Sequence, residues 1–171
     1  MLFLKSAAAG IESSYNLGEG STQGVEIALG TDIGSEGLGI PISMSATFTD
    51  TEFKTDGAFS YTGSSTGTKG KEFPYIPDTM FNIQGGLEFT KARTYLNYFH
   101  QSDIYIDASN TTKLEDYGQL NWSGFYDLTE SATIFAKATN LLDKTYAHGV
   151  APDGYRAGAP RVWTVGMDFK F

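Results

Sequence analysis

The chain has 171 residues and no cysteine, and its 12 basic and 20 acidic side chains give a net charge of −8 at pH 7. This acidic balance argues against nucleic acid as a partner, and the lack of cysteine excludes a disulfide scaffold and a thiolate metal site. A high content of glycine (20) and of aromatic residues (12 Phe, 10 Tyr, 2 Trp) favours an all-β protein, and no apolar run is long enough for a transmembrane helix.

Stretches of alternating apolar and polar residues predict about eight β-strands, because successive side chains of a strand point to opposite faces. The first, over residues 5–15, is weakly defined, with only Ile11 and Tyr15 as apolar anchors. The later stretches cover residues 22–33, 40–49, 79–90, 94–105, 120–128, 133–142 and 161–171. Within 94–105 aromatic residues occur at both parities, so the two faces of that strand are not assigned.

The connections between these stretches alternate in length. Short turns are expected at 34–39, 91–93 and 129–131, and longer loops at 53–73, 106–115 and 143–158. Outer-membrane barrels have short periplasmic turns and long external loops. The alternation therefore predicts that all three longer loops face the cell exterior.

The last stretch has one apolar face. Trp163, Val165, Met167 and Phe169 share a parity with Phe171, whereas the other parity carries mainly small and polar residues. Residues 161–171, tilted as in a barrel, climb roughly 25 Å, the height of the apolar band of an outer-membrane barrel. Periodicity alone does not say whether this face meets lipid or a soluble core; strand length, loop asymmetry and Phe171 favour lipid.

Two short motifs precede this strand and carry a family resemblance. Asn-Leu-x-Asp-x-x-Tyr is followed by Gly-x-Pro-Arg, and the strand after them ends on phenylalanine. Their residues are Asn140, Asp143, Tyr146, Gly158, Pro160, Arg161 and Phe171. In this order and spacing, and with similar strand starts at 24–27 and 74–77, the chain resembles the carboxyl-terminal part of TonB-dependent outer-membrane receptors.

The resemblance implies a fold and a role. The fold is an antiparallel transmembrane β-barrel of about 22 strands, of which about eight would lie here, with the plug domain and signal peptide absent. The lack of a signal-like amino end suggests the tail of a longer protein. The role is active uptake of a scarce nutrient, most often a ferric siderophore or ferric chelate, across the outer membrane of a Gram-negative bacterium. Implied partners are the TonB energy-transducing complex (through the missing part), outer-membrane lipid and the barrel assembly machinery; no cofactor is implied.

The 143–158 loop offers candidate ligand-binding residues: Tyr146, His148, Tyr155 and Arg156. Guanidinium groups pair bidentately with oxyanions and aromatic rings stack, which suits an anionic or catecholate ligand. Arg156 is expected to contribute most, and His148 less, because an exposed imidazole is mostly neutral at pH 7. The alternative is that residues of this loop only brace the strand ends.

No enzyme is predicted. Gly63-x-Ser65-x-Gly67 formally matches a nucleophile elbow, but it lies in a polar tract with no helix after it. The two histidines, His100 and His148, have no partner histidine nearby in the sequence, so no metal site is expected.

Two other interpretations stay open at this point. One is a complete eight-stranded outer-membrane barrel with a structural or adhesive role, and the other is a soluble lipocalin-like binding barrel. The sequence does not identify the ligand.

Overall fold

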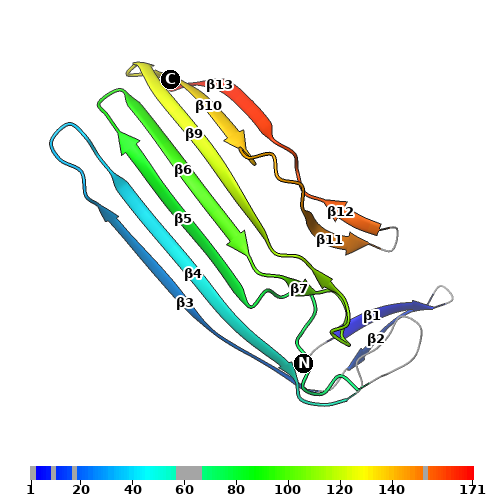
Figure 1. Ribbon diagram of the computed structural model, residues 1–171. Helices are drawn as coiled ribbons and strands as arrows, with labels where there is room; N and C mark the ends of the chain where they lie inside the picture. The colour runs from blue at the N-terminus through cyan, green and yellow to red at the C-terminus, as the bar shows by residue number, and fades with distance from the viewer. Residues whose placement is uncertain (1–2, 9–10, 17–18, 57–66, 152–153) are drawn as a thin grey trace.

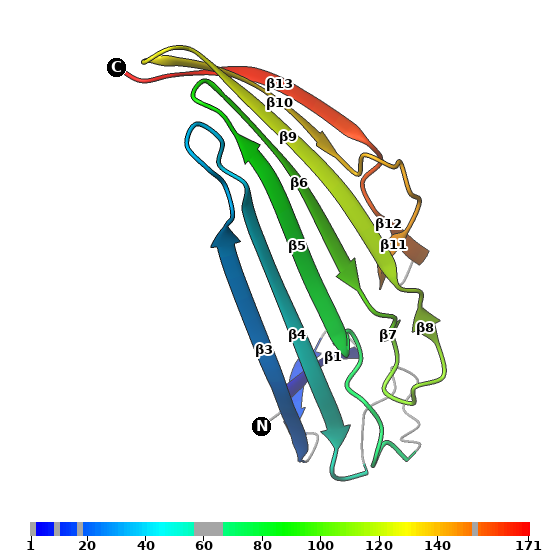
Figure 2. The same cartoon turned by 60° about the vertical axis from the view of Figure 1, so that its left-hand side comes forward.

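A computed structural model describes residues 3–8, 11–16, 19–56, 67–151 and 154–171. Its main feature is one curved, seven-stranded antiparallel sheet (Figures 1 and 2). The strands follow chain order across it: β3 (Gly20–Asp32), β4 (Pro41–Phe53), β5 (Thr79–Glu88), β6 (Ala92–Gln101), β9 (Tyr117–Thr129), β10 (Ala132–Thr139) and β13 (Val162–Phe169). Nothing in these ranges forms a helix long and apolar enough to cross a membrane.

Three two-stranded sheets accompany the main sheet. They pair β1 (Phe3–Ala8) with β2 (Ile11–Asn16), β7 (Ile104–Tyr105) with β8 (Lys113–Leu114), and β11 (Ala147–Ala151) with β12 (Gly154–Ala157). The expected single strand over 5–15 is therefore wrong, since this region is a hairpin outside the main sheet. Its sequence lacks the alternation that would have fixed the length of a strand.

Two predicted strands end earlier than expected, each for a local reason. The 94–105 strand stops at Gln101, where the Ser102 hydroxyl accepts a hydrogen bond from the Thr79 amide. The 133–142 strand stops at Thr139, because Asn140 has a φ of 51° and cannot continue a ladder. The end of the predicted 94–105 strand is instead β7, which pairs with β8 inside the predicted 106–115 loop, and the predicted 143–158 loop contains β11 and β12.

The register aligns the apolar residues of all seven strands on one face, which we call the apolar face. One transverse row runs Leu29, Met44, Ile83, Tyr98, Leu120, and a second runs Ile42, Gly85, Leu96, Trp122, Ala138, Trp163. The register also assigns the faces of β6, placing Leu96, Tyr98 and His100 on the apolar face and Tyr95, Asn97 and Phe99 on the other.

This apolar face is largely uncovered. Val165 is 78% exposed, and Ile27, Leu29, Met44, Trp163 and Phe169 are exposed as well. A soluble domain would bury such a continuous surface, so the face requires an apolar partner. The sheet is also open: β3 and β13 form its two edges and do not pair with each other. Neither the closed eight-stranded barrel nor the lipocalin-like barrel is formed by the described residues.

The short and the long connections between strands lie at opposite ends of the sheet. All three short turns lie at one end of the sheet, whereas the longer connections, with β7–β8 and β11–β12, lie at the other (Figure 1). We call these the short-turn end and the long-loop end. Ser65, from the serine motif, lies outside the described residues.

Candidate functional site

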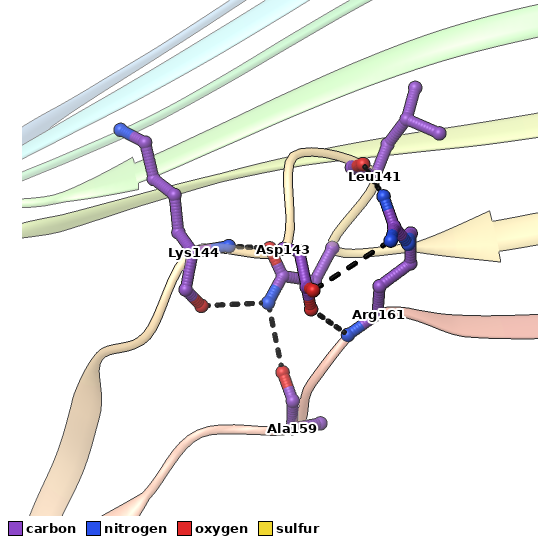
Figure 3. A network of polar contacts seen from close by, with 6 residues as sticks. Leu141, Asp143, Lys144, Ala159 and Arg161 are labelled. Atoms are coloured by element: carbon purple, nitrogen blue, oxygen red, sulfur yellow. Dashed lines mark hydrogen bonds and ion pairs between the residues drawn. The ribbon is translucent and has the colours of Figure 1, made fainter.

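Asn140 organises the exit from β10 at the long-loop end, and Figure 3 shows two of its hydrogen-bonding partners, Lys144 and Ala159. Its side chain is only 1% exposed, and its Nδ2 donates hydrogen bonds to the carbonyl oxygens of Lys144 (2.8 Å) and Ala159 (3.0 Å). Its Oδ1 accepts a hydrogen bond from the Lys144 amide at 3.0 Å. One asparagine thus joins the chain leaving β10 to the chain that enters β13, and its amide and left-handed backbone suit that position.

Asp143 and Arg161 form a second link across the same gap. Asp143 Oδ1 accepts a hydrogen bond from the Arg161 amide at 3.0 Å, and the guanidinium lies 3.7 Å from Asp143 Oδ2. The guanidinium also donates to the Leu141 carbonyl oxygen at 3.4 Å. Pro160 lies between the two links and is exposed, as is Phe171 after β13.

Tyr146 and Gly158 add a further contact to the Asn140 and Asp143–Arg161 links, which together we call the brace. This contact reaches β9. The Tyr146 ring stacks on Tyr117 of β9, with ring centroids 4.4 Å apart and planes 16° apart. A Cβ at position 158 would lie 2.1 Å from the Tyr146 ring, so only glycine fits beneath it. The Gly158 amide also donates to the Tyr146 carbonyl oxygen at 2.7 Å. The motif residues therefore fix the position of Tyr146.

Beside Tyr146 lies a cavity of about 550 Å³. Its aromatic lining residues are Tyr98, His100, Tyr117, Tyr146 and Tyr155, and its charged ones are Lys113, Glu115, Asp116 and Lys144. Ring faces and ammonium groups together can bind a planar ligand that carries negative oxygens. This is the candidate site, and we call it the rim cavity.

Of the four residues predicted to bind ligand, two line the rim cavity and two lie outside it. Tyr146 and Tyr155 line the rim cavity, whereas His148 and Arg156 do not. In the β11–β12 hairpin, Tyr155 pairs with Val150 and Arg156 with Gly149, so the Tyr155 and Arg156 side chains project from opposite faces. Arg156 thus lies outside the rim cavity, and the expectation that it contributes most to ligand binding stays a prediction.

Several lining residues were not predicted from the sequence. Tyr98 and Tyr117 lie outside the 143–158 loop, on the paired strands β6 and β9, and they line the cavity from the end of the sheet. Lys113 comes from β8, where its ammonium lies 2.6 Å from Asp103 and 4.4 Å from the centre of the Tyr105 ring. The hydrogen bond to Asp103 raises the pKa of Lys113, so it remains a cation. Lys144 occupies a variable position of the Asn-Leu-x-Asp-x-x-Tyr motif, so the motif did not predict that it lines the cavity.

The loop that carries Lys113 is held in shape by Asp107. Its carboxylate accepts hydrogen bonds from the amides of Ser109 (3.1 Å), Thr111 (3.1 Å) and Thr112 (2.8 Å). Burial raises the pKa of Asp107, but the hydrogen bonds from Thr111, Thr112 and Ser109 together outweigh it and hold the pKa below its ordinary value.

Across the described ranges, no group of three or more His, Asp or Glu is placed to hold a metal ion.

A comparison with protein families shows to which family this chain belongs. The family described as TonB dependent receptor-like, beta-barrel, matches residues 4–141, which is more than half of the chain. The chain belongs to the TonB-dependent receptor family. Members of this family are outer-membrane proteins of Gram-negative bacteria and are receptors rather than enzymes, in agreement with the sequence-based predictions. No curated protein sequence matches the chain.

Solved structures share the fold of this TonB-dependent receptor chain. The siderophore receptor PiuA from Acinetobacter baumannii superposes with a TM-score of 0.78 at 20% identity, covering 93% of this chain and 23% of that one. The ferric-catecholate import receptor Fiu from E. coli K12 gives 0.69 at 18% identity, covering 98% and 23%. The copper transporter OprC gives 0.71 at 16% identity, covering 99% and 27%. The chain thus spans about a quarter of the length of these barrels and forms a part of such a barrel.

Proposed function

We propose that this chain forms the closing strands and loops of an outer-membrane receptor that takes up a ferric siderophore or another ferric chelate. The observation that carries the proposal is the rim cavity, which gathers Tyr117, Tyr146 and Tyr155 with two lysines at the long-loop end of a TonB-dependent receptor sheet. Tyr98 and His100 also line this cavity, but they project from the apolar face. The similarity in fold to PiuA, a siderophore receptor, and to Fiu, a ferric-catecholate import receptor, supports this ligand class.

The position of the short and long connections at opposite ends of the sheet supports an orientation in the membrane. Barrels of the outer membrane have short periplasmic turns and long external loops, so the rim cavity would open toward the cell exterior. There it would meet ligand before the transport step. Transport itself would be energised by the TonB complex acting on parts of the receptor outside this chain, and folding into the membrane would use the barrel assembly machinery.

The apolar face would contact lipid. Trp163, Val165, Met167 and Phe169 on β13 share this face with the exposed apolar residues of the other strands. The opposite face carries polar groups that interact across strands: the side chains of Asn82 and Asn97 form a hydrogen bond at 2.8 Å. A polar inner face and an apolar outer face are what a large, water-filled barrel requires.

The chemistry of the rim cavity fits a chelate with aromatic and anionic groups. The stacked rings of Tyr117 and Tyr146 are fixed by the brace, so they lose little conformational freedom when a planar group docks against the cavity wall. Lys144 is exposed and forms no ion pair with a described residue, so its charge remains available to an oxyanion. Glu115 and Asp116 would disfavour a ligand that presents negative charge on their side.

Equilibrium binding tests the assignment. The full-length receptor and its variants would be titrated with ferric tris-catecholate and ferric citrate as probes. Tyr155→Ala should weaken binding of the catecholate probe by about 0.5–1.5 kcal/mol, the range for an aromatic contact. Lys144→Ala should weaken it by about 1.5–3 kcal/mol, the range for a hydrogen bond to a charged group. Arg156→Ala is the matched control, because it lies on the opposite face of the same hairpin.

The outcomes separate clearly. Losses at Tyr155 and Lys144 with little change at Arg156 would support the rim cavity as the ligand site. If Arg156→Ala alone weakens binding, the ligand lies on the other side of the hairpin. If none of the three changes affinity while the receptor still binds ferric chelate, this part of the barrel does not contribute to ligand recognition.

A further inference from the structure

Two connections meet at the long-loop end: the 67–78 segment, which leads into β5, and the 102–116 connection, which contains β7 and β8 (Figure 2). Asn110 makes the closest link between them. Its Oδ1 accepts a hydrogen bond from the Glu72 amide at 2.7 Å, and its Nδ2 donates to the Glu72 carbonyl oxygen at 3.0 Å. The Tyr75 amide donates to the Tyr105 carbonyl oxygen at 2.8 Å. We call these three hydrogen bonds the loop clip.

The backbone of both connections is left-handed at the loop clip. Asn110 has a φ of 53°, and Tyr75 has a φ of 63°. Positive φ is unfavourable for residues with a side chain, for tyrosine more than for asparagine, and it persists where surrounding contacts fix the conformation. The Asn110 amide is held as well, because it donates to the Asp107 carbonyl oxygen at 3.1 Å. The loop clip is therefore a defined junction between the two connections.

Phe73 fixes the 67–78 segment to the sheet. Its side chain is 8% exposed, and its ring centroid lies 4.6 Å from that of Phe53 at the end of β4. The Phe73 amide donates to the buried Thr51 hydroxyl at 3.0 Å. A Cβ at position 20 would lie 2.3 Å from the Phe73 ring, so the ring also packs closely on the start of β3. The segment thus carries the position of β3 and β4 to the loop clip.

One wall of the rim cavity lies on the other side of the loop clip. Ile104 of β7 pairs with Leu114 of β8, and both side chains are buried, so this hairpin has a small apolar core. Residues 113–116 line the rim cavity, where Lys113 and Glu115 supply opposite charges. No residue of the 67–78 segment, all of which the structure describes, lines that cavity.

We propose that Asn110 is a positioning residue of the receptor: through the loop clip, the 67–78 segment holds the 113–116 wall of the rim cavity in place for the ligand. A wall that is already fixed loses less conformational freedom on binding, so the ligand binds more tightly. A segment that does not line the cavity thereby sets the affinity of the cavity. The inference rests on the proposed function for its ligand, a ferric chelate.

The position of the wall can be measured without ligand. Lys71 and Glu115 are exposed, and spin labels on Lys71→Cys and Glu115→Cys, as the only cysteines of the full-length receptor, report the distance between the two connections by pulsed electron paramagnetic resonance. The otherwise unsubstituted receptor should give one narrow distribution. Asn110→Gly accepts the positive φ but lacks the side chain, so it should broaden the distribution. Asn97→Ala is the matched control, because it removes an asparagine–asparagine hydrogen bond within the main sheet.

Titration of the unlabelled receptor with ferric tris-catecholate measures the consequence for binding. Asn110→Gly should weaken binding by about threefold to tenfold, the cost of ordering a side chain that the loop clip no longer holds. Asn97→Ala should leave it unchanged. Phe73→Ala should weaken binding to a similar extent. The double variant should bind no more weakly than Phe73→Ala alone, because both residues act through the same link.

The two measurements separate the loop clip from the identity of the ligand. A distance distribution that is equally narrow with and without Asn110→Gly would overturn the proposal, whatever the receptor binds. A broader distribution with unchanged affinity for ferric tris-catecholate, or additive effects of Asn110→Gly and Phe73→Ala, would overturn it too. If the unsubstituted receptor does not bind ferric tris-catecholate but the distances respond as expected, the proposed ligand is wrong and the positioning of the wall is supported.

Discussion

Replacing Asn140 by alanine should destabilise the long-loop end more than any other single change in the described part of the 140–161 segment. The native side chain forms three hydrogen bonds, two as donor to the Lys144 and Ala159 carbonyl oxygens and one as acceptor from the Lys144 amide. Asn140 is also almost fully buried, so water cannot replace these partners without opening the loop. Alanine therefore leaves three backbone groups unsatisfied.

The expected size of the effect can be built from these contacts. A net hydrogen bond contributes about 0.5–1.5 kcal/mol, so three contribute about 3 kcal/mol. The φ of 51° adds a further cost of about 1 kcal/mol for alanine, which asparagine tolerates better. The free energy of unfolding should thus fall by about 3–5 kcal/mol.

Two further variants separate the contribution of the hydrogen bonds from that of the backbone conformation. Asn140→Gly removes the hydrogen bonds but accepts the backbone conformation, so it should recover about 1 kcal/mol relative to alanine. Asn140→Asp keeps the acceptor for the Lys144 amide and loses both donors. The assay is equilibrium urea unfolding of the full-length receptor in lipid vesicles, followed by loss of the folded band on unheated gels. A loss below about 1 kcal/mol for Asn140→Ala would refute the view that this residue joins β10 to β13.

Three other predictions test separate parts of the structure. Val165→Arg should cost about 2–4 kcal/mol in the same unfolding assay if it lies at mid-membrane, whereas Thr164→Arg on the opposite face should be mild; equal tolerance would contradict the face assignment. Gly158→Ala should displace the Tyr146 ring and cost about 1–3 kcal/mol, and unchanged stability would show that the close contact is dispensable. Because the pKa of Asp107 is held below its ordinary value, its ordering of the loop should be complete above about pH 4 and be lost as pH falls through that lower value. Pepsin cleavage of the 103–116 connection should then rise in strong acid in the native receptor, and Asp107→Asn should abolish this pH dependence.

The sequence predicted the strands of the main sheet well, because each strand has one apolar and one polar face. Alternation of apolar and polar residues therefore marks both the position of a strand and its two faces. The strands around Val25, Met44, Ile83, Trp122 and Val165 all lie where their periodicity placed them. Their apolar side chains share one face, because a shift by one residue would turn each strand over. The faces of β6 could not be assigned from its sequence, since Tyr98 and Phe99 are both aromatic and only pairing with β9 separates them.

The site was less predictable, because its residues come together through pairing and side-chain hydrogen bonds. The motif residues Asn140, Asp143 and Arg161 were recognised, but their positions in the structure show contacts that brace the strand ends rather than a ligand surface. Tyr117 enters the rim cavity because Gly158 lets Tyr146 stack on it. No local pattern links these residues, which lie on different strands and loops.

The central claim is that this sheet is a wall of an outer-membrane barrel, with its apolar face in lipid and its long loops outside. Single cysteines provide the most direct measurement, because the chain has none of its own. Thr145→Cys, Glu130→Cys and Val165→Cys would be introduced into the full-length receptor in living cells and treated with a membrane-impermeant maleimide. The account predicts labelling at 145 on intact cells, at 130 only after the outer membrane is permeabilised, and at 165 only after the protein is unfolded. Labelling of 130 on intact cells, or of 165 in the folded receptor, would contradict it.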